Sequence, residues 1–326
     1  MRSSHWLVAV LLVCGCAPVV AKSADTLDVL VIAPHPDDEV LLAAGVMERA
    51  VREGRHVGVI IVTNGDYSCE RDGYLREAES IAALKSLGVK ESDVHFLGYP
   101  DGALSKLTSI PHEPMEHRDA VGQCVARTGT YADRGAGRLD EHTRRTGTPG
   151  DWTSDALIGD LEALLIRLAP TEVYLPHGID EHPDHAATYV YFRRALDRLS
   201  VAPLVHRGVV HAGECWPSDC RKYFTPSLPT PPLPSRYSPS ERLPVDPLLK
   251  LAAITKYTSQ LSPWLTSFAR KDEVFFPEKL ERIGAHWVRV GGEARPDGSR
   301  VNREGHFVEV ARWGTEGFAG VEVRRE

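Results

Sequence analysis

Two short segments of the chain place histidine and carboxylate side chains at close spacing. The first reads PHPDDE over residues 34–39, and the second reads HGIDEHPDH over residues 177–185. Histidine nitrogens and carboxylate oxygens bind zinc, and a catalytic zinc typically keeps three protein ligands and an open position for water. Because Asp37 and Asp38 are adjacent, one carboxylate can bind a metal while the other takes a proton from water. These residue types therefore indicate a hydrolytic metal site.

Both segments follow predicted strands, at residues 27–33 and 172–175. The first strand (LDVLVIA) is nearly continuous in apolar residues, which is typical of a strand covered by helices on both faces. The remaining predicted elements alternate along the chain: strands at 56–63, 94–97 and 204–210, and helices at 41–51, 74–87, 154–168, 183–199 and 248–260. This alternation predicts an α/β fold with a Rossmann-like, doubly wound and mostly parallel sheet. In the common strand order 3-2-1-4, the site is expected at the carboxyl ends of the first and fourth strands.

The two segments resemble the signatures of the PIG-L, or LmbE-like, family of zinc-dependent N-acetylglucosaminyl de-N-acetylases, which are (A/P)HPDDE and HPDH. The resemblance covers about residues 27–275. It implies three metal ligands: His35, Asp38 and His185. It also implies three catalytic residues: Asp37 as general base, His182 assisting at the carbonyl or the leaving amine, and Asp184 orienting a histidine.

The resemblance extends beyond the two motifs to the predicted substrate side of the site. It implies that Arg76 and Asp101 bind sugar hydroxyls, and residues 256–260 (KYTSQ) also look family-like. Residues 105–151 are not part of the minimal family core. They are polar and lack periodicity, which predicts a long surface loop that shapes the substrate mouth.

Other polar and aromatic residues are interpreted as structural. His177 is expected to serve local structure rather than to bind metal, and Tyr131 is expected to pack the loop. The histidines of the 105–151 loop are expected to be solvated: His112, His117 and His142. The tryptophans form no regular stripe that would indicate a sugar-stacking platform, and are therefore expected to be core or interface anchors: Trp152, Trp216, Trp264, Trp287 and Trp313.

Composition sets limits on the partners of the protein. The chain has 326 residues, 42% hydrophobic and 25% charged, as in an ordinary globular enzyme. Its formal net charge of -7 is the opposite of what phosphate binding requires, so nucleic acid is not an expected partner. No apolar run is long enough for a transmembrane helix.

The amino-terminal residues predict export. A positive start and an apolar run resemble a signal peptide over residues 1–21, with either ordinary cleavage after Ala21 or lipidation of Cys16. The expected location is periplasmic, extracellular or lipid-anchored at the cell envelope. Four further cysteines are expected to form disulfides: Cys69, Cys124, Cys215 and Cys220. Cys215 and Cys220 are the local candidate pair, which would leave Cys69 for Cys124, but the connectivity stays open.

These observations predict a deacetylase domain over residues 25–283 and a small C-terminal β appendage over 284–326. The predicted function is an exported, zinc-dependent hydrolase that removes an N-acetyl group from an N-acetylated amino sugar or glycoconjugate, with iron or cobalt as alternative metals. A non-catalytic carbohydrate-binding protein of the envelope is the main alternative. A dinucleotide-dependent oxidoreductase lacks G-x-G-x-x-G after the first strand, and a serine hydrolase lacks G-x-S-x-G.

Overall fold

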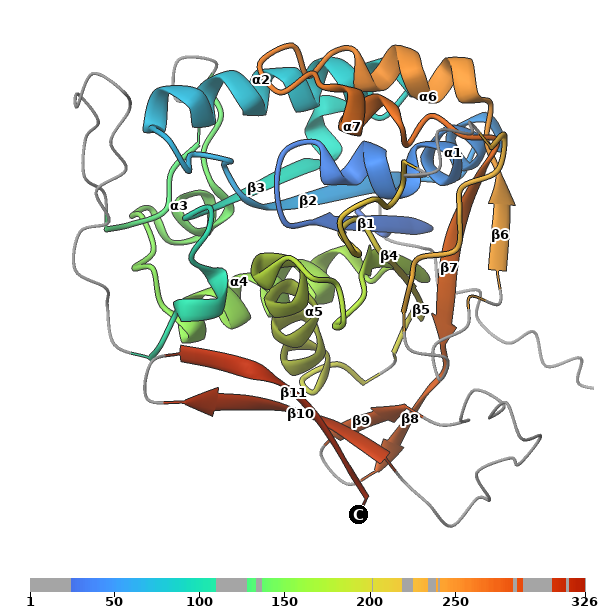
Figure 1. Ribbon diagram of the computed structural model, residues 1–326. Coiled ribbons are helices and arrows are strands. Elements are labelled where there is room, and N and C mark those ends of the chain that lie inside the picture. The colour runs from blue at the N-terminus through green and yellow to red at the C-terminus, as the bar shows by residue number, and fades with distance from the viewer. Residues whose placement is uncertain are drawn as a thin grey trace, which may run out of the picture.

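A seven-stranded sheet in the order β3-β2-β1-β4-β5-β7-β6 forms the centre of the computed structural model (Figure 1). The strands are β1 (Val29–Ala33), β2 (Val57–Thr63), β3 (Val94–Tyr99), β4 (Glu172–Pro176), β5 (Leu204–Gly208), β6 (Glu241–Pro244) and β7 (Asp272–Glu278). The first five pair in parallel, whereas β7 pairs antiparallel with β5 and β6. The predicted Rossmann-like sheet and its order 3-2-1-4 are therefore confirmed. The structure describes residues 25–109, 128–132, 137–200, 202–218, 225–233, 239, 241–283, 286–289, 307–314 and 317–325.

Helices cover the sheet on both faces, as Figure 1 shows. The helices are α1 (Asp38–Arg52), α2 (Glu70–Ser86), α3 (Glu141–Thr146), α4 (Ser154–Leu168), α5 (Pro183–Leu196), α6 (Pro247–Ile254) and α7 (Pro263–Thr266), with short 3-10 turns η1 (Glu91–Asp93) and η2 (Leu104–Lys106). Successive side chains of β1 point to opposite faces. Val29 and Val31 join the core under α1 and α6, while Leu30 and Ile32 join the core under α4 and α5. The apolar run that predicted a strand buried on both faces is explained by this arrangement.

A buried ion pair fastens α1 to α6 and β7. Helix α1 is interrupted at Ala43, whose φ is -139°. The Nζ of Lys250 donates to the carbonyl of Leu41 at 2.7 Å and pairs with Glu273 Oε1 at 2.8 Å. Glu273 also accepts the backbone N–H of Gly45 at 2.9 Å. These contacts satisfy backbone groups at the interruption, and they hold the helix that begins at the PHPDDE segment.

The prediction that residues 105–151 form only a surface loop is wrong for part of the segment. Tyr131 is fully buried. Trp152, which directly follows the 105–151 segment, is 1% exposed and donates its Nε1–H to the carbonyl of Gly98 at 3.1 Å. His142 is not solvated, because its Nδ1 lies 2.9 Å from the buried carboxylate of Asp160. Buried partners of this kind let a polar sequence enter a core. Residues 110–127 and 133–136, with His112 and His117, lie outside the described residues.

The carboxyl-terminal half departs from the predicted elements in two places. Residues 225–247, for which no strand was predicted, contain β6, and β7 was not predicted either. Two antiparallel hairpins follow, β8 (Leu280–Ile283) with β9 (His286–Arg289) and β10 (Phe307–Gly314) with β11 (Gly317–Arg325). They form the predicted β appendage, whereas the domain boundary at residue 283 stays a prediction. The side chains of Trp287 and Trp313 lie outside the described part.

Residues 1–24, with the predicted signal peptide and Cys16, lie outside the described residues. Cys69 and Cys215 are each disulfide-bonded. Because Cys124 and Cys220 fall outside the described part, the pairing stays a prediction. Across the residues that the structure does describe, no helix is both long and apolar enough to cross a membrane.

Candidate active site and metal centre

The two polar segments meet at the carboxyl ends of neighbouring strands. PHPDDE follows β1 and leads into α1, while HGIDEHPDH follows β4 and leads into α5. Because β1 and β4 pair directly in parallel, the two segments leave the same edge of the sheet side by side. Proline at the first position of α5 suits a helix start, and His182 caps that helix by accepting the N–H of Asp184 at 3.3 Å.

Three side chains converge at the meeting point: His35, Asp38 and His185. Asp38 Oδ2 lies 3.0 Å from His35 Nδ1 and 3.0 Å from His185 Nε2, and the two ring nitrogens are 3.3 Å apart. Ligand atoms at usual zinc distances on neighbouring tetrahedral positions lie about 3.3 Å apart. The donor types and their mutual spacing therefore fit a single metal ion held by the residues that the resemblance implied.

Buried carboxylates stand behind each of the two histidines. The Nε2 of His35 lies 3.1 Å from Asp101 Oδ1 and 3.3 Å from Asp184 Oδ2. The Nδ1 of His185 lies 3.4 Å from Asp180 Oδ2. A carboxylate behind a ligating histidine fixes its ring and tautomer. Asp184 therefore stands behind His35, and it is itself fully buried, without exposure to the cavity.

Backbone donors fix these supporting carboxylates. Asp184 accepts the N–H of Gly102 at 2.7 Å and that of Leu104 at 3.0 Å. Asp180 accepts the N–H of Val210 at 2.7 Å and that of His211 at 3.1 Å. The loops after β3 and β5 are thereby tied to the segment after β4. Sequence reasoning missed Asp180, although it lies two residues before the HPDH motif.

The electrostatic environment of the two histidines favours positive charge. Burial alone would lower the pKa of His185, but the neighbouring carboxylates of Asp38 and Asp180 raise it to about 10. The pKa of His35 is likewise raised, against the effect of its burial, chiefly by Asp101. Several buried carboxylates thus surround the two histidines, and a bound cation would compensate their charge.

Asp37 is held in a strained backbone conformation beside the three converging side chains. Its φ is 141°, a region that non-glycine residues rarely adopt and that persists only where surrounding contacts enforce it. Its N–H donates to Glu39 Oε2 at 2.9 Å, and Glu39 Oε1 accepts the hydroxyl of Tyr257 at 2.6 Å. Burial, followed by the negative charge of Asp38, raises the pKa of Asp37 to about 8. A carboxyl group with a pKa near neutrality suits proton transfer in both directions.

The turn before Asp37 is clamped from two further elements. The carbonyl of Pro36 accepts Arg76 Nη2 from α2 at 3.2 Å and Gln260 Nε2 from the segment after α6 at 3.2 Å. Arg76 also donates to Asp101 Oδ2 at 3.2 Å. The 256–260 stretch noted in the sequence therefore supports the PHPDDE turn through both Tyr257 and Gln260.

A cavity of about 450 Å³ opens over the convergence point. Six residues predicted for the site line it: His35, Asp37, Asp38, Arg76, Asp101 and His182. His185 and Asp184 lie behind this lining and are fully buried. No described residue of the 105–151 segment lines the cavity, so its predicted role at the substrate mouth stays a prediction for the part outside the described residues.

The lining also contains Gln260, from the family-like 256–260 stretch, and four residues that sequence reasoning missed: Tyr67, His211, Trp264 and Leu265. Trp264 was interpreted as a core or interface anchor; it does pack against the core, and it also lines the cavity, which was not predicted. His211 comes three residues after β5, at the same edge of the sheet as the two motifs. Functional residues are expected just after the carboxyl ends of the strands, and the same expectation applied to the fifth strand would have identified His211.

Other combinations of histidine and acidic side chains around the cavity also lie close enough together to bind a metal ion. Among the described residues, ligand atoms within 4.8 Å of one another occur in three such sets: His35, His182 and His185; Asp38, His185 and His211; and His35, Asp101 and Asp184.

His177 is buried, and its Nδ1 accepts the N–H of Ile179 at 3.1 Å. This contact agrees with the structural role predicted for His177.

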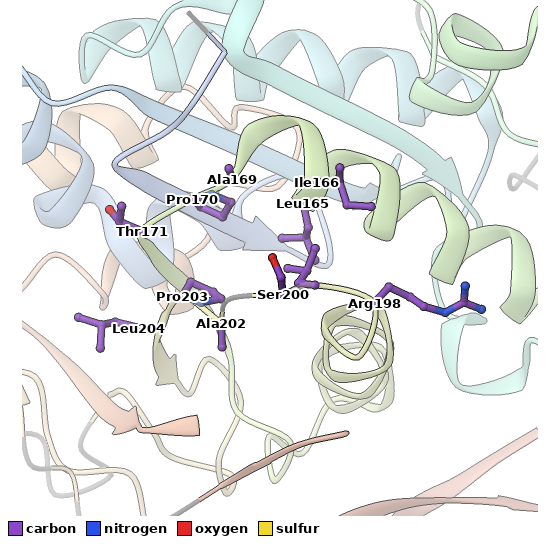
Figure 2. Close-up of a pocket in the computed structure, with 11 residues that line it drawn as sticks. Leu165, Ile166, Ala169, Pro170, Thr171, Arg198, Ser200, Ala202, Pro203 and Leu204 are labelled. Carbon is purple, nitrogen blue, oxygen red and sulfur yellow. The ribbon is translucent and has the colours of Figure 1, made fainter. Parts of the chain in front are cut away.

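A second hollow, of about 670 Å³, lies at the opposite edge of the sheet, beside the amino ends of β4 and β5 (Figure 2). Its wall includes Ile166, Pro170, Pro203 and Leu204. None of the described residues that line it is acidic or a histidine. The described lining of this hollow therefore offers no carboxylate or imidazole ligand for a metal ion.

The chain is similar to several known proteins. A 1D-myo-inositol 2-acetamido-2-deoxy-alpha-D-glucopyranoside deacetylase from Mycolicibacterium smegmatis is 24% identical over 328 residues, covering 90% of this chain and 97% of the relative. A deacetylase of the same name from Saccharomonospora viridis is 28% identical over 174 residues, covering 52% of this chain and 58% of the relative. The solved structure of N,N'-diacetylchitobiose deacetylase from Pyrococcus horikoshii is 17% identical with a TM-score of 0.45, covering 78% of this chain and 84% of that one.

The model of the family PIG-L, described as GlcNAc-PI de-N-acetylase, matches residues 30–196. The match spans just over half of the chain and includes both polar segments and the strands and helices that position them. The protein belongs to the PIG-L family.

Proposed function

We propose that the protein is a metal-dependent hydrolase that removes the acetyl group from an N-acetylated amino sugar or glycoconjugate. The observation that carries the proposal is the strained, buried Asp37, which lines the cavity beside the converging His35, Asp38 and His185. The names of the curated relatives and of the family are those of deacetylases. A protein that only binds carbohydrate has no need of a base held in this way.

His35, Asp38 and His185 would hold the metal. Bound there, a divalent ion would supply Lewis acidity, polarising the amide oxygen and lowering the pKa of a water molecule. We infer zinc from the donor set of two imidazoles and one carboxylate, with iron and cobalt as alternatives. Asp184 and Asp180 lie behind the ligands and act as positioning residues, because neither residue is more than 5% exposed.

Asp37 acts as the general base. It takes a proton from the attacking water and holds that proton until the amine departs. Arg76 Nη2 lies 3.5 Å from Asp37 Oδ2, which keeps the carboxylate oriented toward the cavity floor. Return of the proton to the sugar nitrogen completes cleavage of the C–N bond and leaves acetate and a free amine.

His182 lines the cavity beside the metal ligands, with its ring centroid 4.7 Å from that of His35. From this position it can donate a hydrogen bond to the oxygen on which negative charge develops. Burial and the neighbouring His35 lower its pKa. Its Nδ1 is engaged by the backbone of Asp184, so Nε2 is the nitrogen that faces the reaction.

Arg76 and Asp101 would bind hydroxyl groups of the sugar. They line the cavity, and their mutual hydrogen bond of 3.2 Å holds both side chains in place. The pKa of Asp101 is lowered despite its burial, chiefly by His35 and Arg76, so it is an ionised acceptor for a hydroxyl proton. A guanidinium and a carboxylate side by side offer both donors and acceptors to a diol.

We further propose that the protein is exported and acts on an extracellular or envelope glycan, because residues 1–21 resemble a signal peptide. Disulfides among the four cysteines of the mature chain would be consistent with that location.

Acetate release tests the proposed function. Purified protein from residue 25 onward is loaded with zinc and incubated with N-acetylglucosamine, N,N'-diacetylchitobiose and an N-acetylglucosaminyl inositol. We expect release from at least one of them, with a loss of about 10² to 10⁴ in kcat for Asp37→Ala. Folded, zinc-loaded protein that binds these sugars but releases no acetate would support the carbohydrate-binding alternative and contradict the proposal.

A further inference from the structure

An aromatic pair forms one wall of the cavity and plays no part in the chemistry described above. The rings of His211 and Trp264 are stacked, with centroids 4.8 Å apart and planes inclined by 22°. Both residues line the cavity. The ring of His211 lies 4.9 Å from that of His185 and 5.1 Å from that of His182. Trp264 therefore extends the wall outward, one ring farther from the metal ligands than His211.

The position of this pair is fixed by its surroundings. Trp264 Nε1 donates to the carbonyl of Trp216 at 3.3 Å, and the ring of Phe268 packs edge-on against it at 5.1 Å. The backbone N–H of His211 is bound by Asp180 at 3.1 Å. Because both residues are fixed by these contacts, the wall keeps its shape without a ligand. A preformed wall lowers the entropic cost of binding.

The other side of the cavity has a different character. Arg76 and Asp101 are charged, and they lie against Asp37 at 3.5 Å and His35 at 3.1 Å. On the aromatic side, His211 instead lies against His182 and His185, and Trp264 stacks on His211. A substrate whose amide sits at the metal ligands would thus have a polar wall along one side and an aromatic wall along another.

A pyranose ring matches this division. Its hydroxyl groups lie around the rim of the ring, while its axial C–H bonds give each face an apolar patch that packs well on an aromatic ring. We propose that the His211–Trp264 pair is the stacking surface for a pyranose ring of the substrate, which makes Trp264 a specificity-determining residue. The inference rests on the proposed function, since it concerns the same cavity, and it adds the residues that would recognise the face of the sugar ring.

Steady-state kinetics with N,N'-diacetylchitobiose test the proposal. We expect Trp264→Ala to raise KM about 10-fold with kcat changed less than about 3-fold, because stacking acts on binding. Trp264→Phe keeps an aromatic face and should restore most of the affinity. Leu261→Ala is the matched control, because Leu261 is an exposed apolar residue of the same segment that does not line the cavity. Equal KM values for wild type, Trp264→Ala and Leu261→Ala would overturn the proposal.

Binding measured without turnover separates this proposal from the proposed function. In the Asp37→Ala background, saturation-transfer NMR should show contact between the protein and the ring protons of N,N'-diacetylchitobiose, and Trp264→Ala should weaken it. Binding that is unaffected by Trp264→Ala contradicts the stacking surface but leaves the deacetylase standing. Binding that depends on Trp264 in a protein whose wild type releases no acetate supports the surface and contradicts the deacetylase. Absence of binding contradicts the surface.

Discussion

The hydroxyl of Tyr257 offers a single-atom perturbation that reaches the proposed general base. Tyr257 is fully buried, and its hydroxyl donates to Glu39 Oε1 at 2.6 Å. The other oxygen of Glu39 accepts the N–H of Asp37 at 2.9 Å and so helps to enforce the strained φ of 141°. Tyr257→Phe removes one oxygen atom and leaves a buried carboxylate with one partner fewer.

The expected size of the effect follows from these contacts. A hydrogen bond to a charged buried group contributes about 1.5–3 kcal/mol, so we expect Tyr257→Phe to lower the free energy of unfolding by that amount. A displaced catalytic group costs about 10²-fold when it moves by about 1 Å, and partial relaxation of Asp37 should therefore lower kcat about 10- to 100-fold. KM should change little, because Tyr257 does not line the cavity.

Tyr99→Phe provides the matched control. Its hydroxyl donates to the buried carboxylate of Asp160 at 2.8 Å, so the same kind of bond is lost, but Asp160 has no contact with the Asp37 turn. Urea unfolding followed by circular dichroism should show comparable losses of stability for both variants. Acetate release should fall only for Tyr257→Phe. If both variants, or neither, lowered kcat while unfolding at similar urea concentrations, the link from Tyr257 through Glu39 to Asp37 would be refuted.

Three further predictions concern the framework around the site. Lys250→Met should cost about 3–5 kcal/mol in urea unfolding, because it leaves Glu273 buried without its charge partner, and the double variant with Glu273→Gln should cost less than the sum of the single ones. Gly98→Ala should destabilise by more than about 3 kcal/mol, since an added Cβ would clash with the backbone oxygen of Tyr131, whereas Gly54→Ala, also at positive φ but with no described atom within 4 Å of the added Cβ, should cost only about 1 kcal/mol. Burial would raise the pKa of Glu141, but hydrogen bonds from a histidine and an arginine lower it from 4.5 to about 2. The ionised form of Glu141 therefore stabilises the protein above pH 4.5, and this effect is lost as the pH falls toward 2. After allowance for solvent screening, Glu141→Gln should lower the free energy of unfolding by about 2 kcal/mol at pH 6 and by much less at pH 3. A cost that is the same at both pH values would contradict this assignment.

The sheet and its helices could be predicted because their sequences carry local signals. The apolar run of β1 and the helical spacing of α4 each follow from burial on a known face. Strand β7 was missed because its ends are polar and it contains Pro277, which is tolerated where the missing N–H is not needed. Tyr131 was placed in a surface loop because its neighbours are polar, and only tertiary contacts show that it is buried.

The residues of the site likewise divide into those that the sequence could predict and those that it could not. His35, Asp37, Asp38 and His185 lie in two compact motifs, so their proximity follows from the order of the strands. Trp264 reaches the cavity from a short helix far along the chain, and no local pattern relates it to the motifs. Its position depends on how the segment after α6 packs over the PHPDDE turn, which is a property of the tertiary structure alone.

Metal content and acetate release measured on the same preparations test the central claim most directly. Wild type and Asp37→Ala should each hold about one metal ion per chain, with acetate release only in wild type, if three side chains bind the metal and a fourth moves the proton, as proposed. His185→Ala should lose both metal and activity while remaining folded by circular dichroism. Wild-type protein that is folded, free of metal and still releases acetate, or a His185→Ala variant that keeps both metal and activity, would contradict the account.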